Sequence, residues 1–258
     1  MRRGLTSLIA AMAILLPALA SADTILITGS NRGIGLGLSE AYAEAGWRVI
    51  ATARAPDRAV ELNALAAKYD NLTVDELDVT DDAEIAALAA KYEGTPIDVL
   101  LNNAGVLGDI DKQSADNVDI DEIKFIMDVN VYGPIKMARA FLPHVRASDQ
   151  KKILTMTSGL GSMTLTQRLG RFYGYRMSKA AVNMAMRAMH ADFKSEGLVI
   201  GLIAPGQVET ELLFASGFRG PGSITVDESV AGLMKVIDDI SMETVGLPIN
   251  YNGDQIPW

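Results

Sequence analysis

Tyr175 and Lys179 stand four residues apart in the run Tyr175-Arg176-Met177-Ser178-Lys179, a spacing that could support proton transfer. Residues four apart on an α-helix lie on one face, so the phenol and the ammonium group can point into the same pocket. A free tyrosine has a pKa of about 10 and is a poor acid-base catalyst at neutral pH. A cation beside it stabilises the phenolate and lowers that pKa. Because Tyr and Lys also meet by chance on amphipathic helices, the pair needs support from the rest of the chain.

A glycine-rich run, TGSNRGIG at residues 28–35, lies where a strand pattern meets a helical pattern. Its glycines permit a tight turn and let backbone N–H groups approach a diphosphate, to which the positive end of the helix is also attracted. The spacing G-x-x-x-G-x-G differs from the G-x-G-x-x-G dinucleotide fingerprint, and a purely structural turn is the alternative. The positions that we expect to contact a nucleotide here are Gly29, Asn31, Arg32, Gly33, Ile34 and Gly35.

Hydrophobic periodicity predicts the elements that position these residues. Strands are expected at 24–28, 48–52, 72–77, 99–101, 152–157 and 199–204, and helices at 33–46, 58–69, 82–92, 120–145 and 173–196. This alternation implies right-handed crossovers and a parallel sheet covered on both faces. Such sheets bind ligands beyond the carboxyl ends of their strands, where the strand order switches. We therefore predict an α/β fold, a single-domain doubly wound parallel sheet of the Rossmann type with helices on both faces.

Composition narrows the classes of function. The chain has 258 residues, of which 49% are hydrophobic, which suits one large α/β domain. A formal net charge of −9 argues against nucleic acid as a partner. The chain lacks cysteine, and its two histidines, His144 and His190, are far apart in the sequence. We therefore expect neither disulfides nor a metal site.

The first 22 residues have the pattern of a secretory signal peptide. Arg2 and Arg3 provide a positive start, residues 8–19 are almost wholly apolar, and Ala20-Ser21-Ala22 is an A-x-A cleavage pattern ahead of Asp23. The apolar run is too short for a stable membrane span. We expect residues 1–22 to be removed and residues 23–258 to be exported to the periplasm. A cytoplasmic or N-terminally anchored protein with an uncleaved signal is the alternative.

The motifs occur in an order that resembles the classical short-chain dehydrogenase/reductase family. The run from 28 to 35 is followed by Asn102-Asn103-Ala104-Gly105, Asn130, Ser158, the Tyr175–Lys179 motif and Pro205-Gly206. The match covers the chain from about Thr24 to the C-terminus, and residues 46–54 and 251–258 resemble more narrowly the C-factor and Sniffer-type carbonyl reductases. The resemblance implies an NAD(P)-dependent oxidoreductase that interconverts a small-molecule carbonyl and an alcohol by hydride transfer.

The resemblance also implies four catalytic roles. Tyr175 would donate a proton to the carbonyl oxygen, and Lys179 would lower the pKa of that phenol and bind ribose hydroxyls. Ser158 would hydrogen-bond the same oxygen as an electrostatic stabiliser. Asn130 would hold a water that links Lys179 to solvent. Tyr173 is a rival to Tyr175, but its i+4 neighbour is Met177 rather than a cation.

Thr157 is the corresponding rival to Ser158, and the family pattern favours the second hydroxyl of the pair. The interval from Ser158 to Tyr175 is longer than is usual in the family. We expect the additional residues, within 160–171, to form a loop at the substrate mouth.

The charge at the end of the second strand favours NADP(H) over NAD(H). A carboxylate there selects NAD by binding the 2′-hydroxyl, whereas an arginine accommodates a 2′-phosphate. This chain has Arg54 at that position, and Arg32 in the glycine turn could form the second half of a phosphate clamp. The other cofactor contacts implied by the resemblance are Asp78, Val79, Asn103, Ala104, Gly105, Tyr175, Lys179, Pro205, Gly206, Val208 and Thr210.

Two further expectations concern partners and the class of protein. Met177, Met184, Met186 and Met189 lie on the predicted helix at 173–196, where methionines often fill cores or subunit interfaces, so a homo-oligomer is expected. A nucleotide-binding signalling or regulatory protein with the same fold and little turnover is the alternative to an enzyme. The substrate itself is set by loops at 106–118, 160–172 and 212–225, whose shape the sequence does not define.

Overall fold

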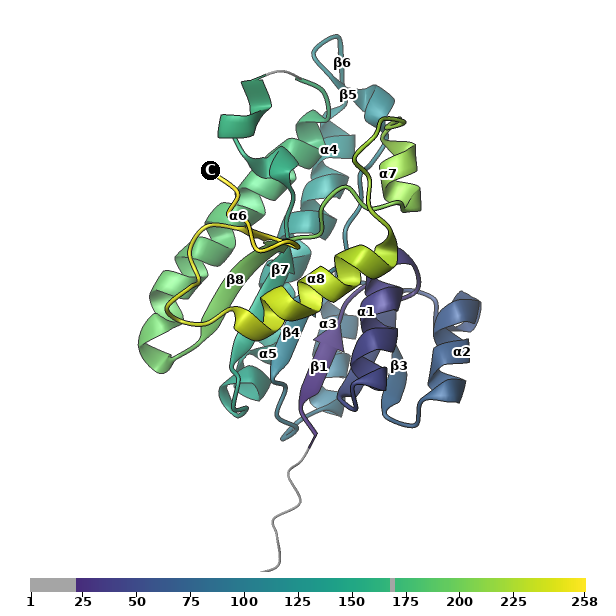
Figure 1. Cartoon of the computed structure of the whole chain (residues 1–258), viewed down its shortest axis with the longest axis vertical. Coiled ribbons are helices and arrows are strands. Elements are labelled where there is room, and N and C mark those ends of the chain that lie inside the picture. Colours follow the sequence, from purple (N-terminus) through teal and green to yellow (C-terminus); the bar gives the residue numbers. More distant parts are fainter. Residues whose placement is uncertain (1–21, 168–169) are drawn as a thin grey trace, which may run out of the picture.

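The fold is organised around a seven-stranded parallel sheet with the strand order β3-β2-β1-β4-β7-β8-β9 (Figure 1). A computed structural model describes residues 22–167 and 170–258. The order reverses between β1 and β4, which places the predicted switch point at the centre of the sheet. The strands are β1 (Thr24–Ile27), β2 (Arg48–Ala53), β3 (Leu72–Glu76), β4 (Val99–Asn102), β7 (Lys152–Met156), β8 (Val199–Ala204) and β9 (Ile249–Asn250).

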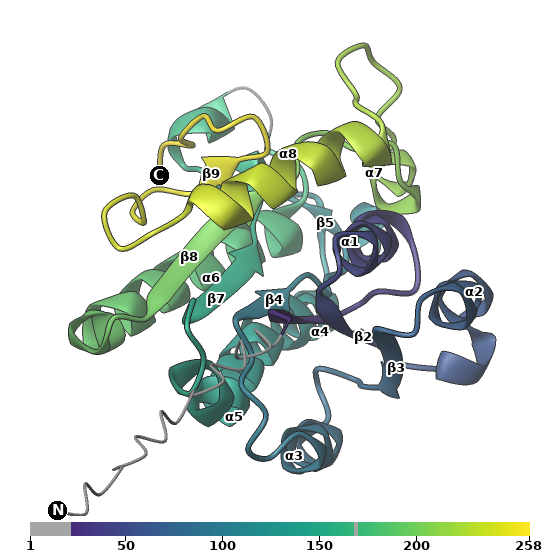
Figure 2. The same cartoon turned by 60° about the horizontal axis from the view of Figure 1, so that its bottom comes forward.

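Helices cover both faces of this sheet (Figure 2). One layer consists of α1 (Gly33–Glu44), α2 (Val60–Lys68) and α8 (Val226–Asp239), and the other of α3 (Asp82–Lys91), α4 (Ile120–Met127), α5 (Gly133–Arg146) and α6 (Tyr173–Phe193). Each layer encloses its own apolar cluster against fully buried strand residues, such as Ile25 on one face and Leu26 on the other. The predicted doubly wound Rossmann-type fold is confirmed.

The helix predicted at 120–145 is interrupted. Its central part, Asp128–Tyr132, is a π-helical segment between α4 and α5. Pro134, the second residue of α5, lacks the N–H that would donate to the carbonyl of Asn130 in a regular α-helix. The helix predicted at 173–196 consists of α6 followed by a 3₁₀ turn at Lys194–Glu196.

Several short elements were not predicted. The hairpin of β5 (Gln113–Ser114) and β6 (Asn117–Val118) and the helix α7 (Glu211–Ala215) lie beyond the carboxyl ends of the strands, at the top of Figure 1. The predicted loop at 160–171 includes 3₁₀ turns at Gly159–Gly161 and Thr164–Gln167.

The predicted signal segment, residues 1–22, lies outside the described residues except for Ala22. In the described parts of the chain, the helices are all too short or too polar to cross a membrane.

Candidate active site

The predicted site residues gather at one edge of the sheet, because parallel strands all end there. The glycine turn follows β1, Arg54 follows β2 and Ser158 follows β7. The remaining segments are Asp78-Val79 after β3, Asn103 to Gly105 after β4 and Pro205-Gly206 after β8. The structure thus brings residues that are far apart in the sequence to the edge where ligands of open α/β sheets bind.

Tyr175 and Lys179 lie on the inner face of α6 and are both buried, with exposed fractions of 8% and 5%. The Lys179 Nζ atom lies 5.6 Å from the centroid of the Tyr175 ring and donates a hydrogen bond of 2.9 Å to the carbonyl of Met156, the last residue of β7. Ser158, two residues after Met156, lies close enough to the Tyr175 phenol to lower its pKa. The three groups that could act on a carbonyl therefore face one another.

Burial controls the protonation of this pair in the unliganded chain. Burial raises the pKa of Tyr175 to about 12, an effect that the nearby Ser158 hydroxyl opposes. Burial also lowers the pKa of Lys179 to about 8, because the low-dielectric interior disfavours the ammonium form. The expected lowering of the Tyr175 pKa by Lys179 is not seen: burial raises this pKa, and Ser158 is the group that opposes the rise.

Asn130 lies in the π-helical segment and is almost fully buried. Its amide accepts a hydrogen bond of 2.8 Å from the Val106 N–H and donates one of 2.9 Å to the Val106 carbonyl. Its Nδ2 atom also donates to the Ser178 hydroxyl at 3.0 Å. A Cβ atom added to Gly105 would lie 3.3 Å from Asn130 Oδ1 and 3.7 Å from Lys179 Nζ, so these residues meet at the site. The Asn130 side chain therefore holds the loop after β4 in place.

The two candidate hydroxyl groups at the end of β7 have different surroundings in the structure. Thr157 is buried and donates a hydrogen bond to Asn183 Oδ1, so its hydroxyl is committed to the interior. Ser158 is only partly buried and lies beside Tyr175, so its hydroxyl is the one of the pair that a substrate could reach. Leu107 and Phe172 form an apolar cluster around the ring of Tyr175, which gives the site a nonpolar wall.

The N-terminus of α1 fits an anionic group. Its first turn, Gly33-Ile34-Gly35, carries no carboxylate that would neutralise the positive end of the helix. A Cβ atom at Gly35 would lie 2.3 Å from the Gly29 carbonyl oxygen, so only glycine allows the turn to fold this tightly. The backbone of this turn is therefore shaped for close approach to a diphosphate, and its residues fit a dinucleotide.

Thr28 joins the glycine turn to the segment after β4. Its hydroxyl accepts hydrogen bonds of 3.0 Å from the N–H groups of Asn103 and Ala104. The Asn103 side chain donates in return to the Thr28 and Gly29 carbonyls at 2.9 and 3.0 Å. The two predicted nucleotide-binding segments therefore form one rigid unit.

The two arginines predicted to bind a 2′-phosphate extend from adjacent strand ends. The Ser30 N–H donates to the Thr52 carbonyl at 2.8 Å, which ties the glycine turn to β2, and Arg54 is exposed just beyond that strand. Arg32 forms an ion pair with Glu211, the first residue of α7, and both side chains are well exposed. A phosphate would compete with this carboxylate for the guanidinium group.

The remaining predicted contacts have local structural partners. Asp78 accepts hydrogen bonds from the Thr80 N–H and hydroxyl at 2.9 and 2.7 Å, and Val79 is buried. The hydroxyl of Thr210 accepts from the Leu213 N–H at 3.4 Å and so caps α7. The last members of the set, Pro205, Gly206 and Val208, occupy the turn between β8 and α7.

Four residues that contact the predicted site residues or their loops were not among the predicted site residues. They are Thr28, Gln113, Arg176 and Glu211. Thr28 and Arg176 lie within the motifs at 28–35 and 175–179, so the sequence could have indicated that they are near the site. Gln113 and Glu211 act on partners that are distant in the sequence, and no local pattern identifies them. Within residues 22–167 and 170–258, no group of three or more His, Asp or Glu side chains is arranged to hold a metal ion.

Residues 23–216 match the family model described as short chain dehydrogenase, and the chain belongs to the short-chain dehydrogenase/reductase family of oxidoreductases. The NADPH-bound carbonyl reductase from chicken fatty liver is similar, with a TM-score of 0.84 and 32% identity over 92% of this chain and 94% of that chain. The carbonyl reductase Sniffer of D. melanogaster has a TM-score of 0.81 and 27% identity over 92% of this chain and all of that chain. C-signal of Myxococcus xanthus is 37% identical over 170 residues, which are 63% of this chain and 93% of that protein.

Proposed function

We propose that this chain is an NADP(H)-dependent oxidoreductase that interconverts a small-molecule carbonyl and an alcohol with the set Asn130, Ser158, Tyr175 and Lys179. The observation that carries the proposal is the buried Tyr175–Lys179 pair beside Ser158 at the carboxyl edge of the sheet. The nonpolar wall formed by Leu107 and Phe172 suits a carbonyl compound with an apolar substituent.

In this proposal each of the four residues has one task. When bound, a reduced nicotinamide supplies the hydride for the carbonyl carbon. The Tyr175 phenol donates its proton to the carbonyl oxygen, while the Ser158 hydroxyl hydrogen-bonds the same oxygen and stabilises its developing charge. The Lys179 ammonium group stabilises the phenolate left on Tyr175. Asn130 holds the water through which the proton is replaced, and alcohol oxidation uses the same groups in reverse.

The preference for NADP(H) is supported by Arg54 and Arg32 at the ends of the first two strands, where a 2′-phosphate would lie. The N-terminus of α1 would hold the diphosphate. The similar chicken carbonyl reductase is described as NADPH-bound, which agrees with this choice.

Tyr175→Phe tests the proposal in the full chain. Fluorescence titration should give tighter binding of NADPH than of NADH to both proteins, because the substitution leaves the arginines and the glycine turn intact. Carbonyl reduction should fall by about 10²- to 10⁴-fold, the usual contribution of a general acid. Full turnover by Tyr175→Phe, or no binding of either nucleotide to the wild type, would refute the enzyme assignment, and tighter binding of NADH would refute only the cofactor preference.

A nucleotide-binding signalling protein is the second candidate, and the similarity to C-signal of Myxococcus xanthus favours it. This candidate predicts nucleotide binding without turnover. A cellular effect that is lost in Arg54→Ala and retained in Tyr175→Phe would support signalling.

Two expectations about the whole protein also remain proposals. Export to the periplasm with removal of residues 1–22 is supported by the sequence pattern, and N-terminal sequencing of the cell-derived protein would test it. A homo-oligomer is supported by Met177 and Met184 on α6, whose exposed fractions are 51% and 70%. Light scattering of the wild type and of Met184→Glu would test whether this face joins two copies.

A further inference from the structure

The catalytic helix α6 receives a hydrogen-bond cap from a distant side chain. Phe172, which precedes α6, has a hydrocarbon side chain that cannot accept a hydrogen bond and a left-handed backbone with φ 67°. The first N–H groups of a helix have no acceptor within the helix, and a side chain at the preceding position usually provides one. Here the Gln113 Oε1 atom accepts a hydrogen bond of 2.9 Å from the Tyr175 N–H.

The same amide also fixes the wall against which the Tyr175 ring lies. Gln113 is fully buried, and its Nε2 atom donates to the Leu107 carbonyl at 2.9 Å and to the Asp109 carbonyl at 3.1 Å. Leu107 belongs to the apolar cluster with Tyr175 and Phe172. One side chain therefore links the backbone of Tyr175 to the loop that packs on its ring.

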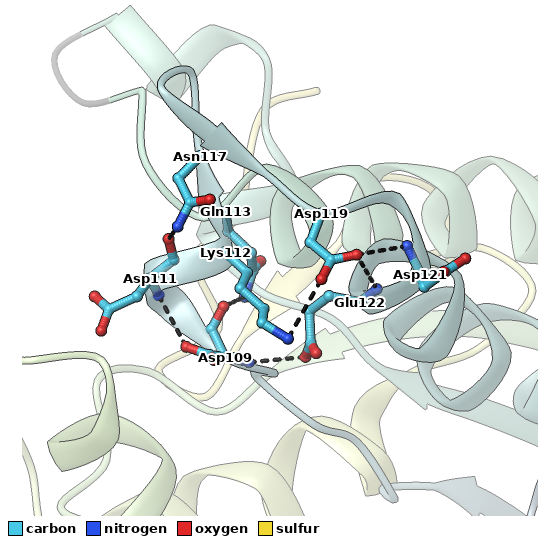
Figure 3. A network of polar contacts seen from close by, with 8 residues as sticks. All are labelled: Asp109, Asp111, Lys112, Gln113, Asn117, Asp119, Asp121 and Glu122. Atoms are coloured by element: carbon cyan, nitrogen blue, oxygen red, sulfur yellow. Dashed lines mark hydrogen bonds and ion pairs between the residues drawn. The ribbon is translucent and has the colours of Figure 1, made fainter.

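Polar contacts around Gln113 connect its segment to α4 (Figure 3). Asp119 caps α4 by accepting from the Glu122 N–H and forms an ion pair of 3.3 Å with Lys112, the neighbour of Gln113. Glu122 in turn accepts a hydrogen bond of 2.8 Å from the Asp109 N–H. Because α4 packs against α6, this network fixes the position of Gln113 relative to Tyr175.

We propose that Gln113 is a positioning residue for the catalytic tyrosine. It caps the first turn of α6 at Tyr175 and fixes the Leu107 wall, so that the phenol stays aligned with Ser158 and the substrate oxygen. The role in turnover rests on the proposed function of Tyr175, whereas the cap itself does not. A neutral amide suits the task because it accepts one hydrogen bond and donates two without burying a charge.

Gln113→Met tests the proposal, because it keeps the length of the side chain and removes its three hydrogen bonds. Asn117→Ala is the matched control, since Asn117 lies in the same hairpin and bonds the Asp111 carbonyl rather than α6. Exchange of the Tyr175 amide proton, followed by NMR, should accelerate by about tenfold or more in Gln113→Met and stay within about twofold in Asn117→Ala. The kcat for carbonyl reduction should fall by about 10- to 100-fold in Gln113→Met, with the Kd for NADPH nearly unchanged.

Gln113→Glu is a second test variant, to be used if Gln113→Met fails to fold. A carboxyl group still accepts from the Tyr175 N–H but donates to at most one of the two carbonyls, so slow amide exchange should persist while the KM for the carbonyl rises. Slow exchange and unchanged kcat in Gln113→Met would overturn the proposal, as would fast Tyr175 exchange in Gln113→Glu. Accelerated exchange in Gln113→Met together with an inactive wild type would refute the proposed enzyme function and leave the cap established.

Discussion

Lys179 lies inside the protein beside Tyr175, and burial lowers its pKa to about 8. Below that pH Lys179 is a cation and can stabilise the phenolate that forms as Tyr175 gives up its proton. Above it the amine is neutral and this stabilisation is lost. We therefore expect kcat/KM for carbonyl reduction to fall above pH 8 by about tenfold per pH unit, because kcat/KM reports the groups of the free enzyme.

Lys179→Arg provides the control for this pH profile. An arginine stays charged throughout the accessible pH range, so the decline near pH 8 should disappear, although the displaced charge lowers the absolute rate. Because Tyr175 and Lys179 interact, the apparent pKa belongs to the pair. A wild-type profile that stays flat to pH 10 would contradict the assignment of Lys179.

The sequence predicts single residues where a motif has fixed spacing and fails where a partner is distant. The spacing of Tyr175 and Lys179 on one helical turn correctly predicts that they share a face. It cannot predict the sign of the pKa shift of Tyr175, because burial depends on Leu107 and Phe172 in other segments. Glu211 illustrates the same limit, since its ion pair with Arg32 spans most of the chain.

Arg176 contacts three residues of the segment between Ser158 and α6. Its guanidinium group donates to the Arg171 carbonyl at 2.7 Å, the Thr166 hydroxyl at 3.1 Å and the Leu160 carbonyl at 3.4 Å. Arg176→Met should therefore loosen this loop. Since each hydrogen bond contributes about 1 kcal/mol, the KM for the carbonyl substrate should rise by about 5- to 30-fold. The kcat should change less, because Tyr175 and Lys179 keep their helix.

Arg139→Met serves as the control, because Arg139 is an exposed arginine on α5 that makes none of these hydrogen bonds. Steady-state kinetics with a small and a bulky carbonyl compound would measure the expected change in KM separately from the smaller change in kcat. Equal KM values for wild type and Arg176→Met with both compounds would show that the loop does not shape the substrate mouth.

Among the helices and strands, hydrophobic periodicity predicts the regular elements of the core. It misses irregular and very short elements. The run of β8 is predicted at its observed bounds because six buried residues follow one another between turns. The π-helical segment has no periodic signature, and only Pro134 indicates where the helix departs from α geometry. The helix α8 was not predicted from the sequence, although Thr225 and Glu228 have the spacing of a capping box and precede an amphipathic run. The two-residue strand β9 is too short for any pattern to predict.

For the whole molecule, the buried pair of Tyr175 and Lys179 makes the free energy of unfolding depend on pH. The folded-state pKa of Lys179, about 8, lies below its ordinary value of 10.5, so the folded chain releases this proton first. The unfolded state then binds more protons between these values, and the free energy of unfolding should rise with pH in that window. Tyr175 acts in the opposite sense above pH 10, because its pKa is raised to about 12 and the unfolded phenol ionises first.

The rise should therefore be visible from about pH 8 to pH 10 and amount to about 2–3 kcal/mol, at about 1.4 kcal/mol per pH unit. Lys179→Met removes the titrating group and supplies the reference, since the net charge of −9 and the other buried groups affect both proteins alike. Urea unfolding of the unliganded proteins at each pH gives the difference between them. A constant difference would mean that Lys179 keeps an ordinary pKa in the folded chain, and the decline of kcat/KM at pH 8 would then need another titrating group.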